Sequence, residues 1–499
     1  MVIDRDVARS VPRCCYGFII FLVVNVYLLW GVALPASHAP TLVDYDIIIQ
    51  PFRIGASTTM AVVPLLVLGL ELGPQQVRKA FRKTLFPCSA LGSVIGLLAF
   101  IGATLSPGGS VLYALSGVLV GLGNSCCFLL WGIVLTRLSA EGCTLVLLLS
   151  GVGSGVLNLV LFSIPSTLGY PIVAILLILS LGGLQMSLRE LPSPSTARTK
   201  LPAWQRLKNL AANLGEPLLC VCALALAFNV FREVAFAQVG GTALVNAISM
   251  LGLIVGTGSM LAVLVLFRVK VPEVSGIYPL AMLVVAACMI PFPFVGANFC
   301  LPFVLVISVF YLLVETLFKG VVAQYARNSG EPALLVFGFG FGVEFAAMAA
   351  GSLMGALPRG TDGENQVMYV IALVLLCMYL LVLPLVSAYR KHKGKASGAN
   401  ETAAPVQERV VIRHVNADEL QQRCEAIAAQ TGITPSELPV MVLLASSQTV
   451  AAISRDLSLS ENTIRSHSKA IYRKLDVHSK QELIDLVANC NNNSAPADH

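Results

Sequence analysis

SENTIRSHSKAIYRKL, residues Ser460 to Leu475, is the stretch that decides how the C-terminal part of this chain folds. Read as a helix, it carries one apolar stripe and one basic stripe. The apolar stripe consists of Ile464, Ile471 and Leu475, and the basic stripe of Arg465, Lys469 and Arg473. Ser460 is a good N-cap, so the helix is about four turns long, which is enough to lie in a DNA major groove. One stripe can therefore pack into a small core while the other faces a polyanion.

Helix start signals flank this stretch on both sides. Residues 434–437 (Thr-Pro-Ser-Glu) form a capping box that opens a helix to Ala445, and Pro439 is expected to make that helix short or kinked. Thr449 caps a second helix over 450–457, and residues 479–482 form another capping box for a closing helix. The tight turn between the second and the third helix predicts a helix-turn-helix module.

Many spaced positions of this segment agree at once with one family. They are Thr434, Glu437, Val440, Leu444, Ala445, Ile453, Leu457, Ser460, Thr463, Ile464, Arg465, His467, Ile471, Tyr472, Lys474, Leu475, Val477, His478 and Ser479. From about Ile433 to Val487 the chain resembles the DNA-binding domain of LuxR-type (NarL/FixJ-type) bacterial regulators. The resemblance implies that the third helix reads the major groove and that the fourth helix pairs two copies on a two-fold-related site. Its implied DNA-facing or phosphate-facing residues are Thr463, Arg465, Ser466, Lys469 and Lys474, to which the basic stripe adds Arg473.

The composition of the whole chain excludes an ordinary soluble protein. Its mean hydropathy is +0.80 and only 12% of its 499 residues are charged, so we expect an integral membrane protein. Its 13 cysteines follow neither disulfide nor metal spacing, and most lie inside apolar runs, which predicts free thiols. The net charge of +6 is spread over the apolar part, so by itself it does not indicate nucleic-acid binding.

Twelve apolar runs, each near the roughly twenty residues that cross a bilayer, predict twelve transmembrane helices. They cover about 16–35, 54–72, 86–105, 111–135, 143–162, 170–188, 217–236, 242–267, 277–295, 299–317, 332–353 and 367–389. The first run is long for a signal peptide, so we expect it to remain as an uncleaved helix. Lysine and arginine fall almost entirely in the even-numbered connections and the N-terminal arm, while the odd-numbered ones hold Arg53 and Arg359. The positive-inside rule then places both termini in the cytoplasm, in a bacterial cytoplasmic (inner) membrane.

The polar connection 189–215 divides the spans into two halves of six, about 1–188 and 216–389. Within it, residues 202–214 are expected to form a helix in the plane of the inner leaflet, ended by Gly215. Six plus six spans with such a bridge resemble the architecture of major facilitator superfamily transporters. The predicted fold is all-α: a polytopic bundle of twelve transmembrane helices with a C-terminal four-helix LuxR-type helix-turn-helix domain.

The segments after the last span have distinct compositions. Residues 390–415 combine a basic juxtamembrane cluster with a linker rich in alanine, serine and glycine. Residues 416–490 hold the predicted DNA-binding domain, with an extra helix over 416–430 whose Leu420, Cys424 and Ile427 pack against that domain or its twin. Residues 491–499 are predicted to be a disordered tail.

Arg232, Glu233 and Glu344 are ionisable residues inside predicted spans, where an unpaired charge costs roughly 2.5 kcal/mol or more. They predict either a ligand pocket or proton-sensitive switch, or an ion pair that fixes helix packing, and both interpretations stay open here. Glu315 and Lys319, four residues apart, favour a structural pair. The chain contains no Walker loop, nucleophile elbow, kinase signature or zinc spacing, so neither an enzyme, a metal site nor a cofactor is expected.

The chain as a whole resembles one-component bacterial regulators that join a transporter-like module to a LuxR-type head. This implies a membrane-embedded transcription regulator with double-stranded promoter DNA, the lipid bilayer and a small-molecule ligand as partners. It further implies a homodimer through the heads and contact with RNA polymerase. Two alternatives stay open: a major-facilitator-like transporter with a regulatory cytoplasmic head, and a membrane protein whose head binds another protein.

Overall fold

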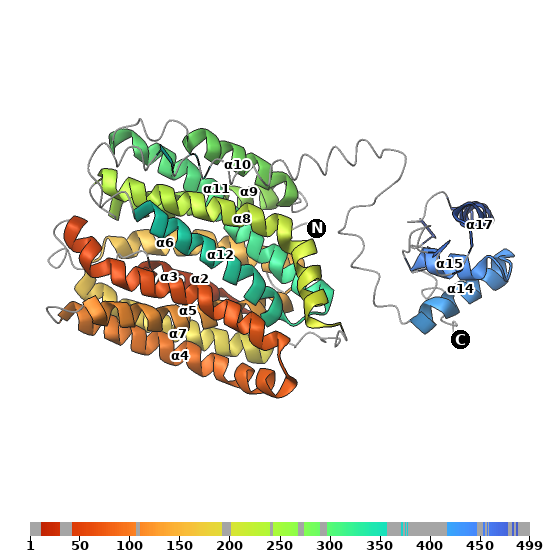
Figure 1. The fold of residues 1–499 in the computed structure, drawn as a ribbon, viewed down its shortest axis with the longest axis horizontal. Helices are drawn as coiled ribbons and strands as arrows, with labels where there is room; N and C mark the ends of the chain where they lie inside the picture. Colours follow the sequence, from red (N-terminus) through yellow and green to blue (C-terminus); the bar gives the residue numbers. More distant parts are fainter. Residues whose placement is uncertain are drawn as a thin grey trace. The chain divides into compact units, whose positions relative to one another are not determined.

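The computed structural model of the protein describes residues 11–29, 42–105, 110–191, 201–239, 243–267, 274–289, 297–356, 371–372, 375, 377, 417–446, 453–454, 457, 459–477, 482–483 and 486–487. Within these residues all regular secondary structure is helical, which confirms the predicted all-α class. The chain divides into two compact units, Met1–Ala396 and Ser397–His499, called the membrane module and the head below (Figure 1).

The described helices of the membrane module follow the predicted spans. They are η1 (Arg13–Tyr16), α2 (Gly17–Leu29), α3 (Leu42–Leu72), α4 (Gln75–Leu105), α5 (Ser110–Arg137), α6 (Ala140–Phe162), α7 (Ser166–Glu190), α8 (Ala203–Val239), α9 (Ala243–Leu266), α10 (Val274–Met289), α11 (Ala297–Ser329) and α12 (Ala333–Ala356). In the described part of the chain, nine helices are long and apolar enough to cross a membrane, and two shorter apolar helices accompany them. The first eleven predicted spans each fall on one of these helices, whereas almost all of the twelfth, 367–389, lies outside the described residues.

The helix expected in the plane of the membrane is instead the first part of α8, so that prediction is wrong. Leu210 and Leu214 are buried, and the Arg206 guanidinium donates to Glu331 Oε2, with Nη2 at 2.6 Å. This segment therefore packs against protein and continues through Gly215 into the seventh span. Glycine often marks the end of a helix because its helix propensity is low. Here the packing of this segment against the rest of the membrane module outweighs that tendency, so the helix continues.

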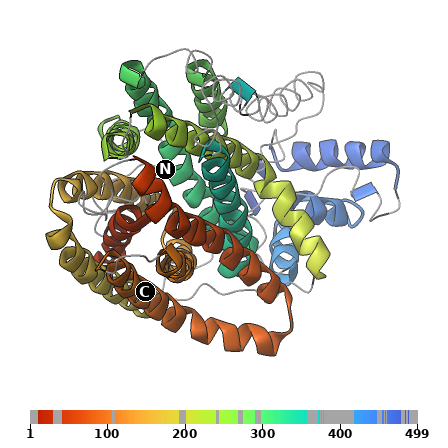
Figure 2. The same ribbon diagram turned by 60° about the vertical axis from the view of Figure 1, so that its left-hand side comes forward.

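The two halves of the membrane module gather as separate groups of helices, drawn in red to yellow and in green to teal (Figure 2). They meet where α3 packs against α12, α6 against α9 and α5 against α11. Within the first half, α3 and α5 approach so closely that a Cβ on Gly117 would lie 2.1 Å from the Phe52 carbonyl oxygen. Small residues at such contacts let helix backbones approach in membranes, where van der Waals packing drives association.

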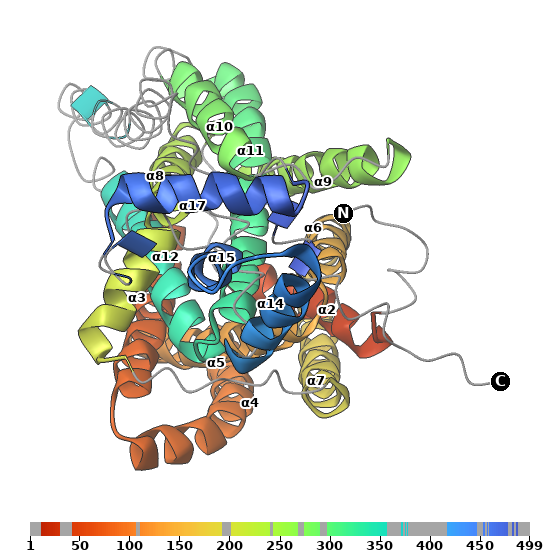
Figure 3. The same cartoon turned by 90° about the vertical axis from the view of Figure 1, so that its right-hand side faces the viewer.

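The head has its own apolar core and contains α14 (Ala417–Thr431), α15 (Leu438–Ala445) and α17 (Glu461–Lys474). In Figure 3 α17 is seen from its side and α15 end-on, and in Figure 1 the reverse, so the two helices cross steeply. The fully buried core residues are Cys424, Val440, Met441, Ile453, Ile464, Ile471 and Leu483. Of the predicted second and fourth helices, 453–454, 482–483 and 486–487 are described as helical, Leu457 is described as a turn, and the rest lies outside the described residues.

Two predictions about the head's first helices are confirmed. The extra helix exists as α14, and its Leu420, Cys424 and Ile427 pack into the head core. α15 is short, because it begins only at Leu438, with Pro439 in its first turn. Proline fits there, since the first helical N–H groups have no intrahelical acceptor.

Candidate DNA-reading helix and membrane cavity

Local interactions define both ends of α17. Ser460 is the N-cap, and its Oγ accepts from the Thr463 backbone N–H at 3.1 Å. At the other end Asp476 adopts a left-handed conformation with φ of 51°, and the Val477 N–H donates to the Tyr472 carbonyl at 3.0 Å. This is the Schellman pattern, which satisfies carbonyls at the end of a helix. The predicted cap and end of the helix are therefore confirmed.

The two predicted stripes of α17 lie on different sides of the helix. Ile464 and Ile471 are fully buried and Leu475 is 8% exposed, so the apolar stripe enters the head core. The exposed residues of the basic side are Arg465, Ser466, Lys469 and Arg473, with Thr463 half-buried beside them. We call these five residues the polar face of α17. The face combines three cations with two hydroxyls, the side chains that recognise phosphates and base edges.

Lys474, the sixth predicted DNA-binding residue, has partners within the head. Its Nζ donates to Glu437 Oε2 at 2.7 Å and to the Gly432 carbonyl at 3.0 Å. The same Glu437 oxygen accepts from the Thr434 backbone N–H at 2.7 Å, which is one half of the predicted capping box. Lys474 thus joins the end of α17 to the start of α15, a role that spacing alone did not indicate. Its predicted contact with DNA stays a prediction.

A cavity of about 160 Å³ lies in the membrane module between the two halves. Its charged lining residues are Arg53, Arg232, Glu233, Glu315 and Lys319, and its neutral polar lining includes Asn25, Gln50, Ser57, Ser154, Asn229, Thr316 and Ser352. Two members of the predicted membrane site, Arg232 and Glu233, therefore face one cavity. Glu344 is not among its lining residues.

Arg53 was assigned to a loop by its sequence, and that assignment is wrong. It lies inside α3, where its Nη1 donates to Glu233 Oε2 at 3.3 Å and its Nη2 donates to Oε1. This ion pair joins the two halves at the cavity. The Arg232 guanidinium stands over the ring of Phe236, 5.1 Å from its centroid, which is cation–π geometry.

On α11, the Lys319 ammonium donates to Glu315 across one helical turn, so the predicted pairing of these two residues is confirmed, while its structural role stays a prediction. The sequence reading placed Lys319 beyond the tenth span. Since α11 continues to Ser329, the side chain of Lys319 is buried at 6% exposure and faces the cavity. Extending the tenth span by one helical turn would have placed this cation within the bundle.

Glu344 is fully buried on α12. Within the described part of the chain, neither of its carboxylate oxygens has a hydrogen-bond partner. Among the described residues, Lys319 and Glu315 are charged groups near enough to act on it electrostatically. Glu344 therefore belongs to the same electrostatic environment as the cavity, although it is not part of the lining.

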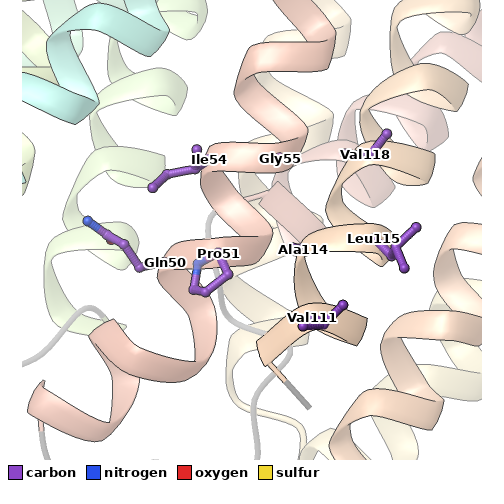
Figure 4. A pocket seen from close by; sticks show the side chains of 8 residues that line it. All are labelled: Gln50, Pro51, Ile54, Gly55, Val111, Ala114, Leu115 and Val118. Atoms are coloured by element: carbon purple, nitrogen blue, oxygen red, sulfur yellow. The ribbon is translucent and has the colours of Figure 1, made fainter.

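A second, shallow groove lies on the outer surface between α3 and α5 (Figure 4). Its lining is Gln50, Pro51, Ile54, Gly55, Val111, Ala114, Leu115 and Val118, almost entirely apolar. In a transmembrane bundle such an outward apolar surface faces lipid chains. We therefore treat this groove as lipid-facing surface.

Comparison with known proteins identifies the head. Residues 431–487 match the family described as bacterial regulatory proteins, luxR family. The head is a LuxR-type helix-turn-helix domain. α14 precedes the matched residues and is therefore an addition to this domain. No curated protein matches the chain in sequence.

Two solved structures are similar to the chain in fold. A crystal structure of the E. coli fucose:proton symporter FucP shares 14% sequence identity with this chain at a TM-score of 0.48. The aligned region covers 75% of this chain and 97% of the FucP chain. A structure described as a major facilitator superfamily transporter, FucP, in the outward conformation shares 12% identity at a TM-score of 0.47, with coverage of 74% and 96%.

The Lys474 contact makes the stability of the LuxR-type head depend on acid pH. The hydrogen bond from Lys474, followed by that from the Thr434 N–H, lowers the pKa of Glu437 from 4.5 to about 2. Between pH 4.5 and pH 2 the unfolded head therefore binds more protons at Glu437 than the folded head does. The contribution, about 1.5 to 3 kcal/mol, is complete above about pH 4.5 and is lost as the pH falls toward 2.

Thermal unfolding of the fragment 416–499, followed by circular dichroism from pH 7 to pH 3, measures this effect. Glu437→Gln should lower the melting temperature at pH 7. The further decrease in melting temperature between pH 7 and pH 3 should be smaller in this variant than in the unmodified head. The matched control is Glu425→Gln on α14, an exposed carboxylate that, among the described residues, accepts from Gln421 at 3.0 Å. If the two variants show the same pH profile, the Lys474 contact does not stabilise the head.

Proposed function

We propose that this protein is a membrane-embedded one-component transcription regulator. Its LuxR-type head binds double-stranded promoter DNA, and its membrane module anchors the head to the cytoplasmic membrane of a bacterium with both termini in the cytoplasm. The membrane module senses a small-molecule signal. Two heads pair on a two-fold-related site, and the bound heads contact RNA polymerase.

The observation that carries this proposal is the polar face of α17. Three cations and two hydroxyls lie along one side of a capped helix whose opposite side is buried. In a helix-turn-helix domain the helix that follows the turn enters the major groove. Arg465 and Lys469 suit guanine O6 and N7, and Arg473 suits a phosphate.

The membrane module supports the sensing role by its charged interior. Charged groups inside a bilayer are costly and mark ligand or ion sites, and here five of them line a cavity between two helical halves. A ligand that binds one arrangement of the halves more tightly than another shifts their populations. The head then responds through its tether, which also raises the effective concentration of neighbouring heads.

DNA binding by the isolated head tests the proposal most directly. The fragment 416–499 should shift promoter DNA taken from beside its own gene, and its affinity should fall as salt increases, because phosphate contacts release counterions. A scrambled duplex of equal length is the control. Equal binding of both duplexes, or no binding at low salt, would exclude a sequence-reading head and favour one that binds protein.

Three further measurements address the topology of the chain, transport by the membrane module and pairing of the heads. An alkaline phosphatase fusion at the C-terminus should be inactive in cells, whereas a green fluorescent protein fusion should be fluorescent, since both termini are cytoplasmic. Substrate flux into proteoliposomes that Glu344→Gln abolishes would favour a transporter with a regulatory head. Crosslinking of the DNA-bound head should give a dimer.

A further inference from the structure

Asn462 is an exposed residue of α17 that the predicted DNA-binding set does not contain. It is the second residue of the helix, since α17 begins at Glu461 after the Ser460 cap. Residues seven or eleven positions apart on a helix lie nearly in line, because 3.6 residues make one turn. Asn462 therefore lies in line with Lys469 and Arg473 and extends the polar face of α17 toward the N-terminus of the helix.

The neighbouring Thr463 lies off this line. It follows Asn462 by one position, which turns its side chain by about 100° around the helix axis. Thr463 is half-buried, and its hydroxyl lies 2.8 Å from Ser460 Oγ in the cap of the helix. In the first turn of α17, Asn462 is therefore an exposed member of the polar face, whereas Thr463 belongs partly to the cap.

The amide of Asn462 has no structural task within the described part of the chain. An asparagine at the start of a helix commonly accepts from the free backbone N–H groups there. In α17 Ser460 does so, since its Oγ accepts from the Thr463 backbone N–H at 3.1 Å. No described residue is a hydrogen-bond partner of the Asn462 side chain. Its donor and its acceptor are therefore available to a molecule that meets the polar face.

An amide at this position suits adenine. In helix-turn-helix domains the N-terminal residues of the helix in the major groove contact base edges. There adenine presents the N7 acceptor and the N6 amino donor side by side, and one asparagine amide meets both, with Nδ2 donating to N7 and Oδ1 accepting from N6. Guanine presents two acceptors at the same place, which match a cation better than an amide. Because Asn462 is neutral, it adds little to the attraction of phosphates.

We propose that Asn462 is a specificity-determining residue that reads an adenine in the promoter site. This inference rests on the proposed function, because it requires that the head bind DNA through α17. It adds a base that the cations of the polar face do not select, since Arg465 and Lys469 suit guanine. The recognised half-site then contains at least one A·T pair beside its G·C pairs.

The spacing along α17 places this adenine. Asn462 and Arg465 are separated by about 4.5 Å along the helix axis, and stacked base pairs by about 3.4 Å along the duplex. For a helix that lies along the groove, the adenine falls within about two base pairs of the guanine that Arg465 contacts. Lys469 lies about 6 Å further along the axis and reads beyond that guanine.

Selection of DNA by the full-length protein in lipid nanodiscs tests the proposal. A library of random duplexes is bound, recovered and sequenced with the unmodified protein and with Asn462→Ala. The unmodified protein should enrich a site in which an adenine lies within about two base pairs of a guanine. The variant should lose the preference for adenine and keep that for guanine, which also shows that its head is folded. Gln422→Ala, which removes an exposed amide from α14, should leave both preferences unchanged.

Replacing that adenine by 7-deazaadenine removes the N7 acceptor and tests the contact itself. In titrations of fluorescent duplexes, the unmodified protein should bind the deaza duplex at least about five-fold more weakly than the adenine duplex, as expected for the loss of a base contact. Asn462→Ala should bind the two duplexes equally, because it has no amide to lose a partner.

Three outcomes would overturn the proposal: an enriched site without adenine, a preference for adenine that survives Asn462→Ala, or equal binding of the two duplexes by the unmodified protein. Enrichment of a guanine-containing site without an adenine that depends on Asn462 would contradict this inference and leave the proposed function intact. Enrichment of no sequence at all would contradict both.

Discussion

Replacing both Arg465 and Lys469 by alanine is expected to remove specific promoter binding by the LuxR-type head. Both side chains are exposed on the polar face of α17, one helical turn apart. Each side chain that reads a base contributes about 1 to 3 kcal/mol of discrimination, so each single change should weaken binding about five-fold to more than a hundred-fold. We expect the two effects to add, because each side chain is predicted to contact a base of its own.

Fluorescence anisotropy with labelled promoter DNA and the fragment 416–499 measures these affinities. The matched control is Gln422→Glu, which changes the net charge by the same amount as one of the alanine variants but lies on the exposed side of α14. It should weaken binding only slightly and equally for all sequences, through long-range repulsion. Unchanged promoter affinity after both alanine substitutions would show that α17 is not the reading helix.

In the head, sequence patterns predicted most of what the structure contains. The cap at Ser460, the buried stripe through Ile464 and Ile471, and the helix α14 all follow from local spacing. Local signals suffice because each feature lies within one or two helical turns of its cause. The contact between Lys474 and Glu437 was not predicted, since it joins residues 37 positions apart whose meeting depends on how α17 crosses α15.

In the membrane module, apolar runs predicted the helices but not their ends or partners. Arg53 and Lys319 were placed outside spans because hydropathy decreases at charged residues, yet both lie within helices whose charges face the cavity. The partner of Glu233 was unpredictable from spacing, because Arg53 is 180 residues away. A cavity between two halves is a property of the assembled bundle, and no local pattern describes it.

Polar contacts between the halves lie toward opposite ends of the bundle. Near the end of α11, Arg327 Nε donates to the Thr136 carbonyl in the last turn of α5 at 3.1 Å. Within the second half, Glu331, which follows α11, pairs with Arg206 at the beginning of α8, so the beginning of α8 lies at this same end. Glu233 lies near the other end of α8, where it holds Arg53. A signal that opens one end and not the other would change the arrangement of the halves.

Breaking the pair of Arg53 and Glu233 is expected to destabilise the membrane module strongly. The two side chains are 11% and 2% exposed. Glu233→Gln removes the negative charge to which Arg53 Nη1 and Nη2 both donate, and loss of one partner of a buried pair costs about 3 to 5 kcal/mol. The double variant Arg53→Gln with Glu233→Gln should be more stable than the single one, because no charge of this pair then remains uncompensated. The apparent melting temperature of the full-length protein in detergent, in a double-mutant cycle, measures the coupling.

Glu141→Gln is the matched control for this cycle, since it makes the same chemical change in the first turn of α6, where the half-buried carboxylate lies at the helix N-terminus and acts on Arg327 through space. It should cost less than about 1 kcal/mol. A coupling energy near zero would mean that water solvates Arg53 and Glu233 separately, and the pair would then not hold the halves together. A large coupling would instead show that this ion pair holds the two halves together, so that any molecule competing with Glu233 for Arg53 would alter their arrangement.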